Sequence, residues 1–297
     1  MAFIFSRRAY LPAESRFTNS ASGTTRYLRL VASDAGPHGG PAMSPTDWLA
    51  MVQDTAQTPD ILIFVHGYNT SQAALWRRHM VLKLKLVENG YKGALVSYDW
   101  PSDGDRLRYI SERREAKAVS TAFLADGILM LLTRAAGYRV HILAHSMGAY
   151  LTLRALAAFG GVGRVDQVIF TAADINSAWM GSGVWGGMVM QRRCLRFTNY
   201  HNPDDKVLVL SKNWFHSGAE RAGLEGLPGR TPPNCRDVYC ARQYQIGTAA
   251  RTLARSHNWY FEDSGFYRDL SMTLAGVKAA QMPTRVATNK GGQALYA

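Results

Sequence analysis

The hydrophobic pattern of the chain changes near residue 61. The first 60 residues hold one or two strand-like runs, notably 27–32, followed by a segment rich in Gly and Pro at 36–41. From residue 61, apolar runs of strand length alternate with longer helical stretches. This alternation is typical of a mostly parallel central sheet flanked by crossover helices, an α/β fold. We therefore expect residues 1–60 to form an N-terminal extension that packs on the edge of this sheet.

The same pattern predicts where the individual elements lie. We expect strands at 61–65, 93–98, 140–143, 167–171, 195–200 and 237–241. We expect helices at about 71–88, 111–134 and 264–280. No linker or internal repeat divides residues 61–282, so they are predicted to form one domain. Residues 283–297 are polar and rich in Gly, which predicts a flexible tail.

One strand-to-helix junction carries a candidate nucleophile. Residues 139–150 read R-V-H-I-L-A-H-S-M-G-A-Y, an apolar run that breaks at Ser146 and continues into a helix of small residues. A nucleophile elbow needs small residues two positions before and after the nucleophile, because the turn is tight and strained. Ala144 and Gly148 meet this requirement, although the usual pattern G-x-S-x-G has Gly at the first position.

A serine nucleophile needs a base and a carboxylate that orients the base. On this type of sheet they follow the serine in the order acid, then histidine. His257 follows the last predicted strand and is favoured over His201 and His216. For the acid we favour Asp205, which begins a predicted helix just after a strand. The alternatives are Asp204 and Asp174, and either Asp204 or Asp205 could instead serve only as a helix N-cap.

A second strand end offers an oxyanion hole. The strand at 61–65 runs into His66-Gly67-Tyr68, and Gly67 permits the backbone conformation that turns the next amide toward the site. We expect the Tyr68 N–H and the Met147 N–H to stabilise the oxyanion of an acyl-transfer reaction. Taken alone, this segment also fits an ordinary Gly turn before a helix that Asn69 or Ser71 caps.

Three motifs occur together and in order: V-H-G-Y-N at 65–69, Y-D-W-P-S at 98–102 and A-H-S-M-G at 144–148. On these motifs the chain resembles the α/β-hydrolase superfamily over roughly residues 60–275. More narrowly, it resembles a bacterial family of uncharacterised α/β hydrolases with V-H-G-Y-N and W-P-S motifs. The resemblance implies an α/β-hydrolase domain at 61–282 and a serine hydrolase in which Ser146, Asp205 and His257 form the catalytic triad. It does not imply a substrate.

The expected reaction is the cleavage of a small-molecule acyl ester by an esterase or lipase-like mechanism, through an acyl-enzyme and without a metal or organic cofactor. A thioesterase or amidase would use the same residues. A non-catalytic binding protein on a hydrolase fold is the alternative from another class, and the presence of all three triad residue types argues against it.

Two segments are candidates for the walls of the site. Residues 176–190 are rich in Gly, Met and Trp, and here Trp179 and Met180 could form an adaptable apolar wall for an acyl chain. An ordinary loop with buried Trp side chains is equally compatible with this composition. Only about twenty residues separate the neighbouring strands, so no large cap domain is expected. Trp100 follows another strand and could line the pocket.

The composition is that of a globular protein, with 47% hydrophobic and 19% charged residues. The formal net charge of +12 predicts attraction to anions, including weak association with an anionic membrane surface. No nucleic-acid-binding motif accompanies the charge, so no specific nucleic-acid partner is expected. The oligomeric state is not encoded in any pattern that we recognise.

The start of the chain and its cysteines bear on the compartment. The N-terminal apolar stretch precedes its charges, the reverse of a secretory signal, and no apolar run reaches membrane-spanning length. Three cysteines, Cys194, Cys235 and Cys240, do not resemble a disulfide framework or a metal site. These features favour a cytoplasmic protein with reduced thiols, although Cys235 and Cys240 could pair in an oxidising compartment.

Overall fold

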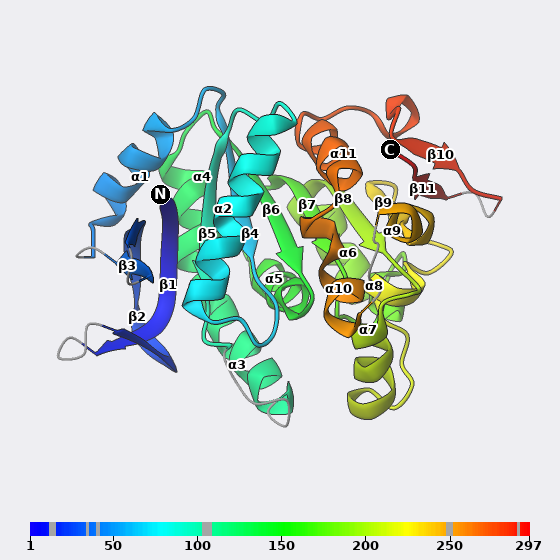
Figure 1. Cartoon of the computed structure of the whole chain (residues 1–297), viewed down its shortest axis with the longest axis horizontal. Helices are drawn as coiled ribbons and strands as arrows, with labels where there is room; N and C mark the ends of the chain where they lie inside the picture. Colours follow the sequence, from blue (N-terminus) through cyan, green and yellow to red (C-terminus); the bar gives the residue numbers. More distant parts are fainter. Residues whose placement is uncertain (12–15, 34–35, 40–41, 103–108, 248–251, 290–291) are drawn as a thin grey trace.

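The computed structural model describes residues 1–11, 16–33, 36–39, 42–102, 109–247, 252–289 and 292–297, and every structural statement below concerns these residues. They contain one sheet of eleven strands in the order β10-β11-β9-β8-β7-β6-β4-β5-β1-β2-β3 (Figure 1). The strands are β1 (Ala2–Leu11), β2 (Arg16–Ser33), β3 (Gly36–Gly39), β4 (Asp60–Val65), β5 (Ala94–Asp99), β6 (Arg139–His145), β7 (Val165–Thr171), β8 (Cys194–His201), β9 (Cys235–Tyr239), β10 (Arg285–Ala287) and β11 (Gln293–Leu295).

Helices connect the strands and cover both faces of the sheet. The α-helices are α1 (Pro45–Asp54), α2 (Gln72–Glu88), α3 (Tyr109–Ala122), α4 (Met130–Arg134), α5 (Met147–Ala157), α6 (Trp185–Arg193), α7 (Lys206–Leu210), α8 (Ala222–Glu225), α9 (Ala241–Gly247), α10 (Leu253–Asn258) and α11 (Ser264–Leu274). A π-helical turn, η3 (Phe123–Leu129), joins α3 to α4, and a second one, η5 (Ser211–Phe215), continues α7. The short 3₁₀ turns are η4 (Ser177–Met180), η6 (Trp259–Phe261) and η7 (Ala279–Gln281).

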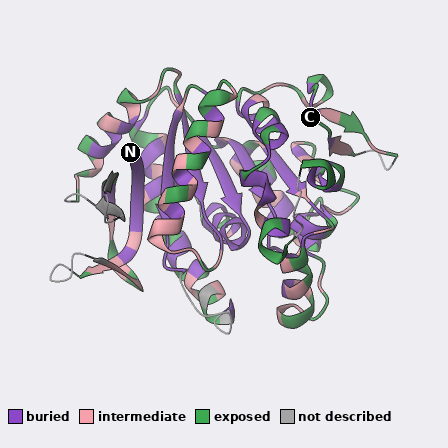
Figure 2. Cartoon of the chain, in the orientation of Figure 1, coloured by how far each residue is buried: buried purple, intermediate pink, exposed green. Residues whose placement is uncertain are grey.

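The expected α/β-hydrolase architecture is confirmed, with a mostly parallel sheet between helical layers. From β1 through β5, β4, β6, β7, β8 and β9 to β11, neighbouring strands run parallel, and only β2, β3 and β10 pair antiparallel. Every residue of β4 and β5 is buried, because helices cover both faces (Figure 2). Alternate residues of β4 pack into opposite clusters, Ile63 with α1 and α5, and Phe64 with α2 and α11.

The N-terminal segment is built into the sheet. β1 lies parallel beside β5, with Phe3 opposite Val96, and β2 and β3 continue the sheet antiparallel. The Phe5 ring is fully buried 5.0 Å from the ring of Tyr98 and 6.2 Å from that of Phe123. The extension therefore shares one hydrophobic core with the rest of the fold.

The C-terminal segment corrects our expectation of a flexible tail from residue 283. β10 and β11 pair with each other, and β11 lies parallel beside β9. Leu295 is fully buried, and the Arg285 guanidinium contacts the buried Asp269 carboxylate at 2.6 Å. A polar, Gly-rich composition did not reveal this anchoring, because it depends on contacts with other elements: Asp269 of α11 lies 16 residues before Arg285, and β9 lies farther back in the chain.

One helical run among the described residues, Arg113–Arg134, meets the length and hydropathy expected of a membrane-spanning helix, contrary to our reading of the sequence. Half of its most apolar window is buried in the fold. Val119, Phe123 and Leu131 belong to the hydrophobic cluster on one face of the sheet. Packing against the sheet thus accounts for the apolar composition of this run.

Candidate active site

The turn between β6 and α5 places Ser146 in a strained conformation. Its φ of 55° and ψ of −123° are rare for a residue with a side chain and cost about 1–3 kcal/mol. Two backbone hydrogen bonds hold the turn: the Ser146 N–H donates to Thr171 O at 3.0 Å, and the Asp174 N–H donates to Ser146 O at 3.2 Å. The end of β7 therefore supports the elbow that the sequence predicted at this junction.

Gly148 shows why the position after the elbow must be small. A Cβ added there would lie 2.6 Å from Val65 O and closer still to His66 O, both on the backbone at the end of β4. α5 thus passes against β4 at a distance that only Gly allows. Ala144, the other small position of the elbow, is fully buried in the sheet.

Replacing Gly148 with Ala is expected to destabilise the fold by about 1–3 kcal/mol, because the backbone of β4 would have to move away from the added methyl group. Helix propensity alone favours Ala over Gly by about 1 kcal/mol, so the two effects have opposite signs. Chemical denaturation measures the difference. Gly160→Ala, where a Cβ meets nothing within 4 Å, is the control; a Gly148→Ala protein as stable as the parent would contradict the close approach.

Asp205 and His257 form a buried pair. Asp205 caps α7: its Oδ1 accepts hydrogen bonds from the N–H groups of Val207 and Leu208, both at 3.0 Å. Its Oδ2 lies 2.7 Å from His257 Nδ1, on α10. Since a carboxylate only accepts, the Nδ1 proton belongs to the histidine, and the lone pair of the neutral ring lies on Nε2. The N-cap role and the pairing with histidine thus occur together in one side chain.

The other candidate acids and histidines have different partners. Asp204 accepts a hydrogen bond from Gln245 at 2.8 Å near the surface. His201 contacts Asp237 at 3.2 Å, and His216 lies 2.8 Å from the Tyr109 hydroxyl. Of the candidate acid–histidine pairs in the described part of the chain, Asp205 and His257 lie at hydrogen-bond distance, whereas His216 Nε2 lies 3.9 Å from Asp174 Oδ1.

His145 connects the elbow to His257. Its Nε2 donates to the backbone carbonyl of His257 at 3.0 Å, and the two rings meet edge to face with centroids 4.7 Å apart. Burial, together with the charges of His257 and Arg78, lowers the pKa of His145 well below its ordinary value. The neutral ring of His145, the last residue of β6, thus packs against α10. Within the described ranges no hydrogen bond joins Ser146 Oγ to the His257 ring, and such bonds often tighten only when substrate binds.

The segment after β4 is oriented by several donors on one carbonyl. Gly67 O lies 2.9 Å from His66 Nδ1 and accepts from the hydroxyls of Ser102 and Thr70, both at 3.1 Å. Because the peptide is planar and trans, the Tyr68 N–H points away from these donors. A Cβ at Gly67 would lie 2.8 Å from Ser146 Cβ, so this peptide lies directly against the elbow.

A buried ion pair that the sequence did not reveal supports this segment. Arg8 of β1 contacts the Asp99 carboxylate at 2.6 Å and donates to Thr70 O at 2.6 Å, and Asp99 is fully buried at the end of β5. Burial raises the pKa of Asp99, but Arg8 and His66 outweigh it, and the pKa lies below its usual range. We refer to Arg8, Asp99 and Thr70 as the loop brace. No local signal marks Arg8, because its partners lie far along the chain.

A second buried cluster surrounds Asp174, the remaining candidate acid. Its carboxylate accepts hydrogen bonds from the hydroxyls of Tyr109 and Ser211 and lies 2.9 Å from Arg221 Nε. Burial opposes ionisation, but Arg221 and Arg113 keep the pKa of Asp174 below its ordinary value. Asp174 therefore joins the end of β7 to α3 and to the end of α7. Its position after a strand makes Asp174 a candidate acid in the sequence, and in the structure this position lets its carboxylate connect several elements.

The candidate wall residues occupy different environments. Trp100 is fully buried, donates its indole N–H to His66 O at 3.0 Å and stacks on the His66 ring. Met180 is also fully buried in the core. We therefore correct the expectation that these two side chains contact substrate. Trp179 is half-buried, 5.3 Å from the ring of Trp185, and keeps a solvent-facing surface.

The cysteines are unpaired and buried. Cys235 and Cys240 belong to hydrophobic clusters on opposite faces of the sheet, so the pairing considered from the sequence is not formed. Burial raises the pKa of the Cys235 thiol to about 12 and that of Cys240 well above its ordinary value. Burial also raises the pKa of the Cys194 thiol, so all three thiols are protonated at neutral pH.

Structure comparison aligns the chain with solved structures of hydrolases. A hydrolase from Oleispira antarctica, olei00960, aligns with 80% of this chain and 98% of its own, at 9% identity and a TM-score of 0.43. The Pyrococcus furiosus esterase Pf2001 aligns with 74% of this chain and 82% of its own, at 13% identity and a TM-score of 0.41.

Sequence comparison identifies one relative and the family to which the chain belongs. An uncharacterized protein of Nostoc sp., alr1448, is 38% identical over 118 residues, a match that spans 32% of this chain and 30% of that protein. Residues 42–225, more than half of the chain, match the model of a family described as alpha/beta hydrolases of unknown function. These residues contain the elbow, the loop brace partner Asp99 and Asp205. The chain belongs to this family of alpha/beta hydrolases, DUF900.

Proposed function

We propose that the protein is a serine hydrolase that cleaves acyl esters with Ser146 as the nucleophile, His257 as the base and Asp205 as the acid of a triad. The observation that carries this proposal is the buried contact of 2.7 Å between His257 Nδ1 and Asp205 Oδ2, together with the 3.0 Å contact between the His257 carbonyl and His145, the residue before Ser146. An alpha/beta hydrolase family supports hydrolysis in general. The ester substrate and the residue roles are our inference.

The first half of the reaction forms an acyl-enzyme. His257 Nε2 takes the Ser146 Oγ proton while Oγ attacks the ester carbonyl carbon, and Asp205 stabilises the resulting imidazolium. The tetrahedral intermediate then expels the alcohol, which receives the proton from His257. Asp205 is suited to its role because two N–H groups of α7 hold its Oδ1, which leaves Oδ2 directed at the histidine.

The negative charge on the carbonyl oxygen needs donors that are already in place. Met147 is the first residue of α5, where amide groups lack partners within the helix and the helix dipole favours an anion. The Tyr68 N–H is the second proposed donor, since the donors on Gly67 O turn this peptide away from them. In the second half of the reaction, water activated by His257 releases the acid, and no metal or organic cofactor takes part.

Aromatic rings beside the proposed oxyanion site favour an apolar acyl group. The ring of Tyr68 lies 5.8 Å from that of Tyr109, which stacks on Phe215 at 4.3 Å. Both Tyr68 and Phe215 are half-buried and keep some exposed surface. A hydrocarbon chain or ring would cover this surface.

Fluorophosphonate labelling tests the proposal. We expect the native protein to be labelled, and Ser146→Ala and His257→Ala to lose labelling, because the probe reacts only with an activated serine. Ser182→Ala, at an exposed serine outside the site, should label like the native protein. A well-folded native protein that is not labelled, or a Ser146→Ala variant labelled as strongly as the native one, would contradict the proposed nucleophile.

A panel of p-nitrophenyl esters of increasing acyl length, with matched thioesters and anilides, then identifies the bond type. We expect esters to be cleaved fastest, and longer acyl chains to lower KM until the aromatic surface is covered. A higher kcat/KM for the thioester or anilide of the same acyl group would replace the ester assignment.

A further inference from the structure

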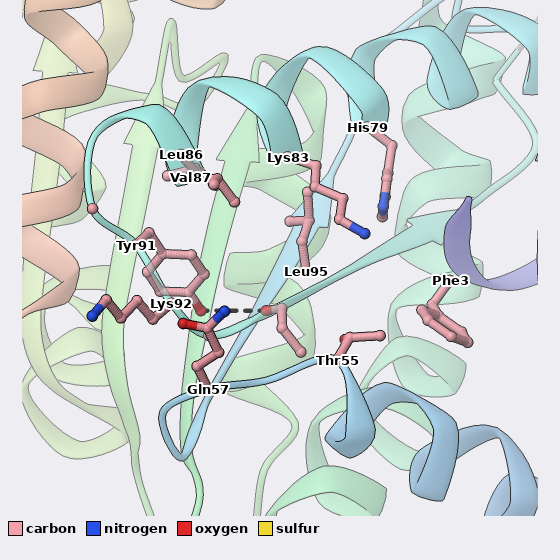
Figure 3. A pocket seen from close by; sticks show the side chains of 13 residues that line it. Phe3, Thr55, Gln57, His79, Lys83, Leu86, Val87, Tyr91, Lys92 and Leu95 are labelled. Atoms are coloured by element: carbon pink, nitrogen blue, oxygen red, sulfur yellow. Dashed lines mark hydrogen bonds between the residues drawn. The ribbon is translucent and has the colours of Figure 1, made fainter.

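A pocket of about 170 Å³ lies apart from the proposed active site (Figure 3). It opens between the C-terminal half of α2, the turn that leads into β5 and the residues after α1. Ala94, the first residue of β5, lines it, whereas Asp99 of the loop brace is the last residue of that strand. The pocket is therefore at the opposite end of β5 from the proposed site.

Apolar side chains form the inner walls of this pocket. Leu86, Tyr91 and Leu95 are less than 9% exposed, and Phe3 of β1 closes one side. The Tyr91 hydroxyl donates to Ala94 O at 3.3 Å, so its polar atom is already used and the ring faces the pocket as an apolar surface (Figure 3). These walls suit a hydrocarbon group.

The charged side chains among the described residues that line the pocket are lysines, and none of those residues carries a carboxylate. Lys83 and His79 extend from α2 toward the same space (Figure 3). Within the described part of the chain Lys83 has no ion-pair partner, whereas Lys85, two residues further along α2, pairs with Glu88 at 2.8 Å. An unpaired ammonium group beside apolar walls attracts an anion.

His79 adds a neutral donor. Its Nδ1 lies 2.8 Å from the buried Ser97 hydroxyl, and burial, Lys83 and the N-terminal ammonium together lower the pKa of His79 to about 3. The ring is thus neutral at physiological pH. In the tautomer in which Nδ1 accepts from the Ser97 hydroxyl, the ring proton lies on Nε2, where a ligand can accept it.

We propose that this pocket binds a small monocarboxylate, with its carboxylate on Lys83 and His79 and its ring or short alkyl chain against Leu86, Tyr91 and Leu95. The volume sets the size, since a cavity of about 150 Å³ accommodates benzene. Lys92 also lines the pocket, but its ammonium group points away from Lys83 and His79 (Figure 3), so Lys83 and the neutral His79 ring face a single negative charge. The proposal does not depend on the reaction at Ser146, so binding is expected to be unchanged in Ser146→Ala.

Benzoate is the probe, and binding is followed by calorimetry and by the NMR signals of the His79 ring. We expect saturable binding that Lys83→Met weakens about tenfold or more, as for the loss of a charge-assisted hydrogen bond. Lys83→Arg, which keeps the charge, and Lys85→Met, on the same helix outside the pocket, should bind benzoate like the native protein. Thermal unfolding checks that each variant is folded.

Benzyl alcohol, which has the ring without the charge, should bind at least tenfold more weakly than benzoate. Three results would overturn the proposal: no saturable benzoate binding, equal loss of affinity in Lys83→Met and Lys85→Met, or benzyl alcohol binding as tightly as benzoate. A shift of the His79 signals upon benzoate addition to the Ser146→Ala protein locates the ligand independently of catalysis.

Discussion

Asp205→Asn is expected to lower kcat/KM for ester hydrolysis about 10,000-fold while changing the free energy of unfolding by less than about 1 kcal/mol. Asparagine is as good an N-cap as aspartate, so its side-chain oxygen can keep the hydrogen bonds from Val207 and Leu208. It cannot stabilise a positively charged His257, and its NH₂ group favours the tautomer with the proton on Nε2. Steady-state kinetics and chemical denaturation separate the two effects.

The neighbouring carboxylates provide matched controls. Asp204→Asn should leave both activity and stability nearly unchanged, because the hydrogen bond that its carboxylate makes among the described residues comes from the neutral Gln245 side chain. Asp174→Asn should cost more stability than Asp205→Asn, since Arg221 would remain buried beside a neutral side chain. A larger loss of kcat for Asp174→Asn than for Asp205→Asn, in protein shown to be folded, would transfer the acid role to Asp174.

Arg8→Met is expected to destabilise the protein by about 3–5 kcal/mol, because it leaves the Asp99 carboxylate buried without its cation. It also removes the donor to Thr70 O, so the peptide between Gly67 and Tyr68 loses part of its support and kcat should fall. Chemical denaturation measures the first effect, and ester hydrolysis by the folded variant measures the second. Arg7→Met, at the partly exposed neighbour, should cost less than about 1 kcal/mol.

The same ion pair predicts a pH dependence. The pKa of Asp99 is lower in the folded protein than in the unfolded chain, so its contribution to stability is complete above the unfolded pKa of about 4. This contribution disappears as the pH falls through the lower pKa of the folded state. The free energy of unfolding of Arg8→Met should therefore fall less than that of the native protein between pH 5 and about pH 2. Parallel curves of unfolding free energy against pH would contradict a stabilising ion pair between Arg8 and Asp99.

The double variant Arg8→Met with Asp99→Leu distinguishes support of the loop from charge burial. Removing both charges should recover much of the stability, because neither group remains buried without a partner. Activity should not recover to the same extent, since Thr70 O still lacks its donor. Full recovery of kcat would show that Arg8 serves only to neutralise Asp99.

Local rules allowed the elbow and the parallel core to be predicted from the sequence. Continuous apolar runs are typical of strands buried on both faces, and β4 to β8 lie close to the predicted positions. The strained turn at Ser146 joins β6 to α5, two elements that are adjacent in the chain, so its pattern of small residues could be read locally. Chain order alone also reduced the candidates for acid and base to a few residues.

Long-range packing decided the rest. Asp174 and Asp205 both follow a strand, so the local sequence does not distinguish them. The position of α10 gives Asp205 a histidine partner, and the position of α3 gives Asp174 a tyrosine partner. Arg8 and Arg285 look like ordinary surface cations in the sequence, yet each meets a buried carboxylate on another element of the fold. Trp100 and Met180 are residue types that can line a binding site, but both are buried in the fold.

The sequence by itself determined the fold class and the elbow, because backbone geometry and strand burial act over a few residues. Only the tertiary structure decided which side chains meet and which are exposed, because those contacts join segments that the chain order does not bring together.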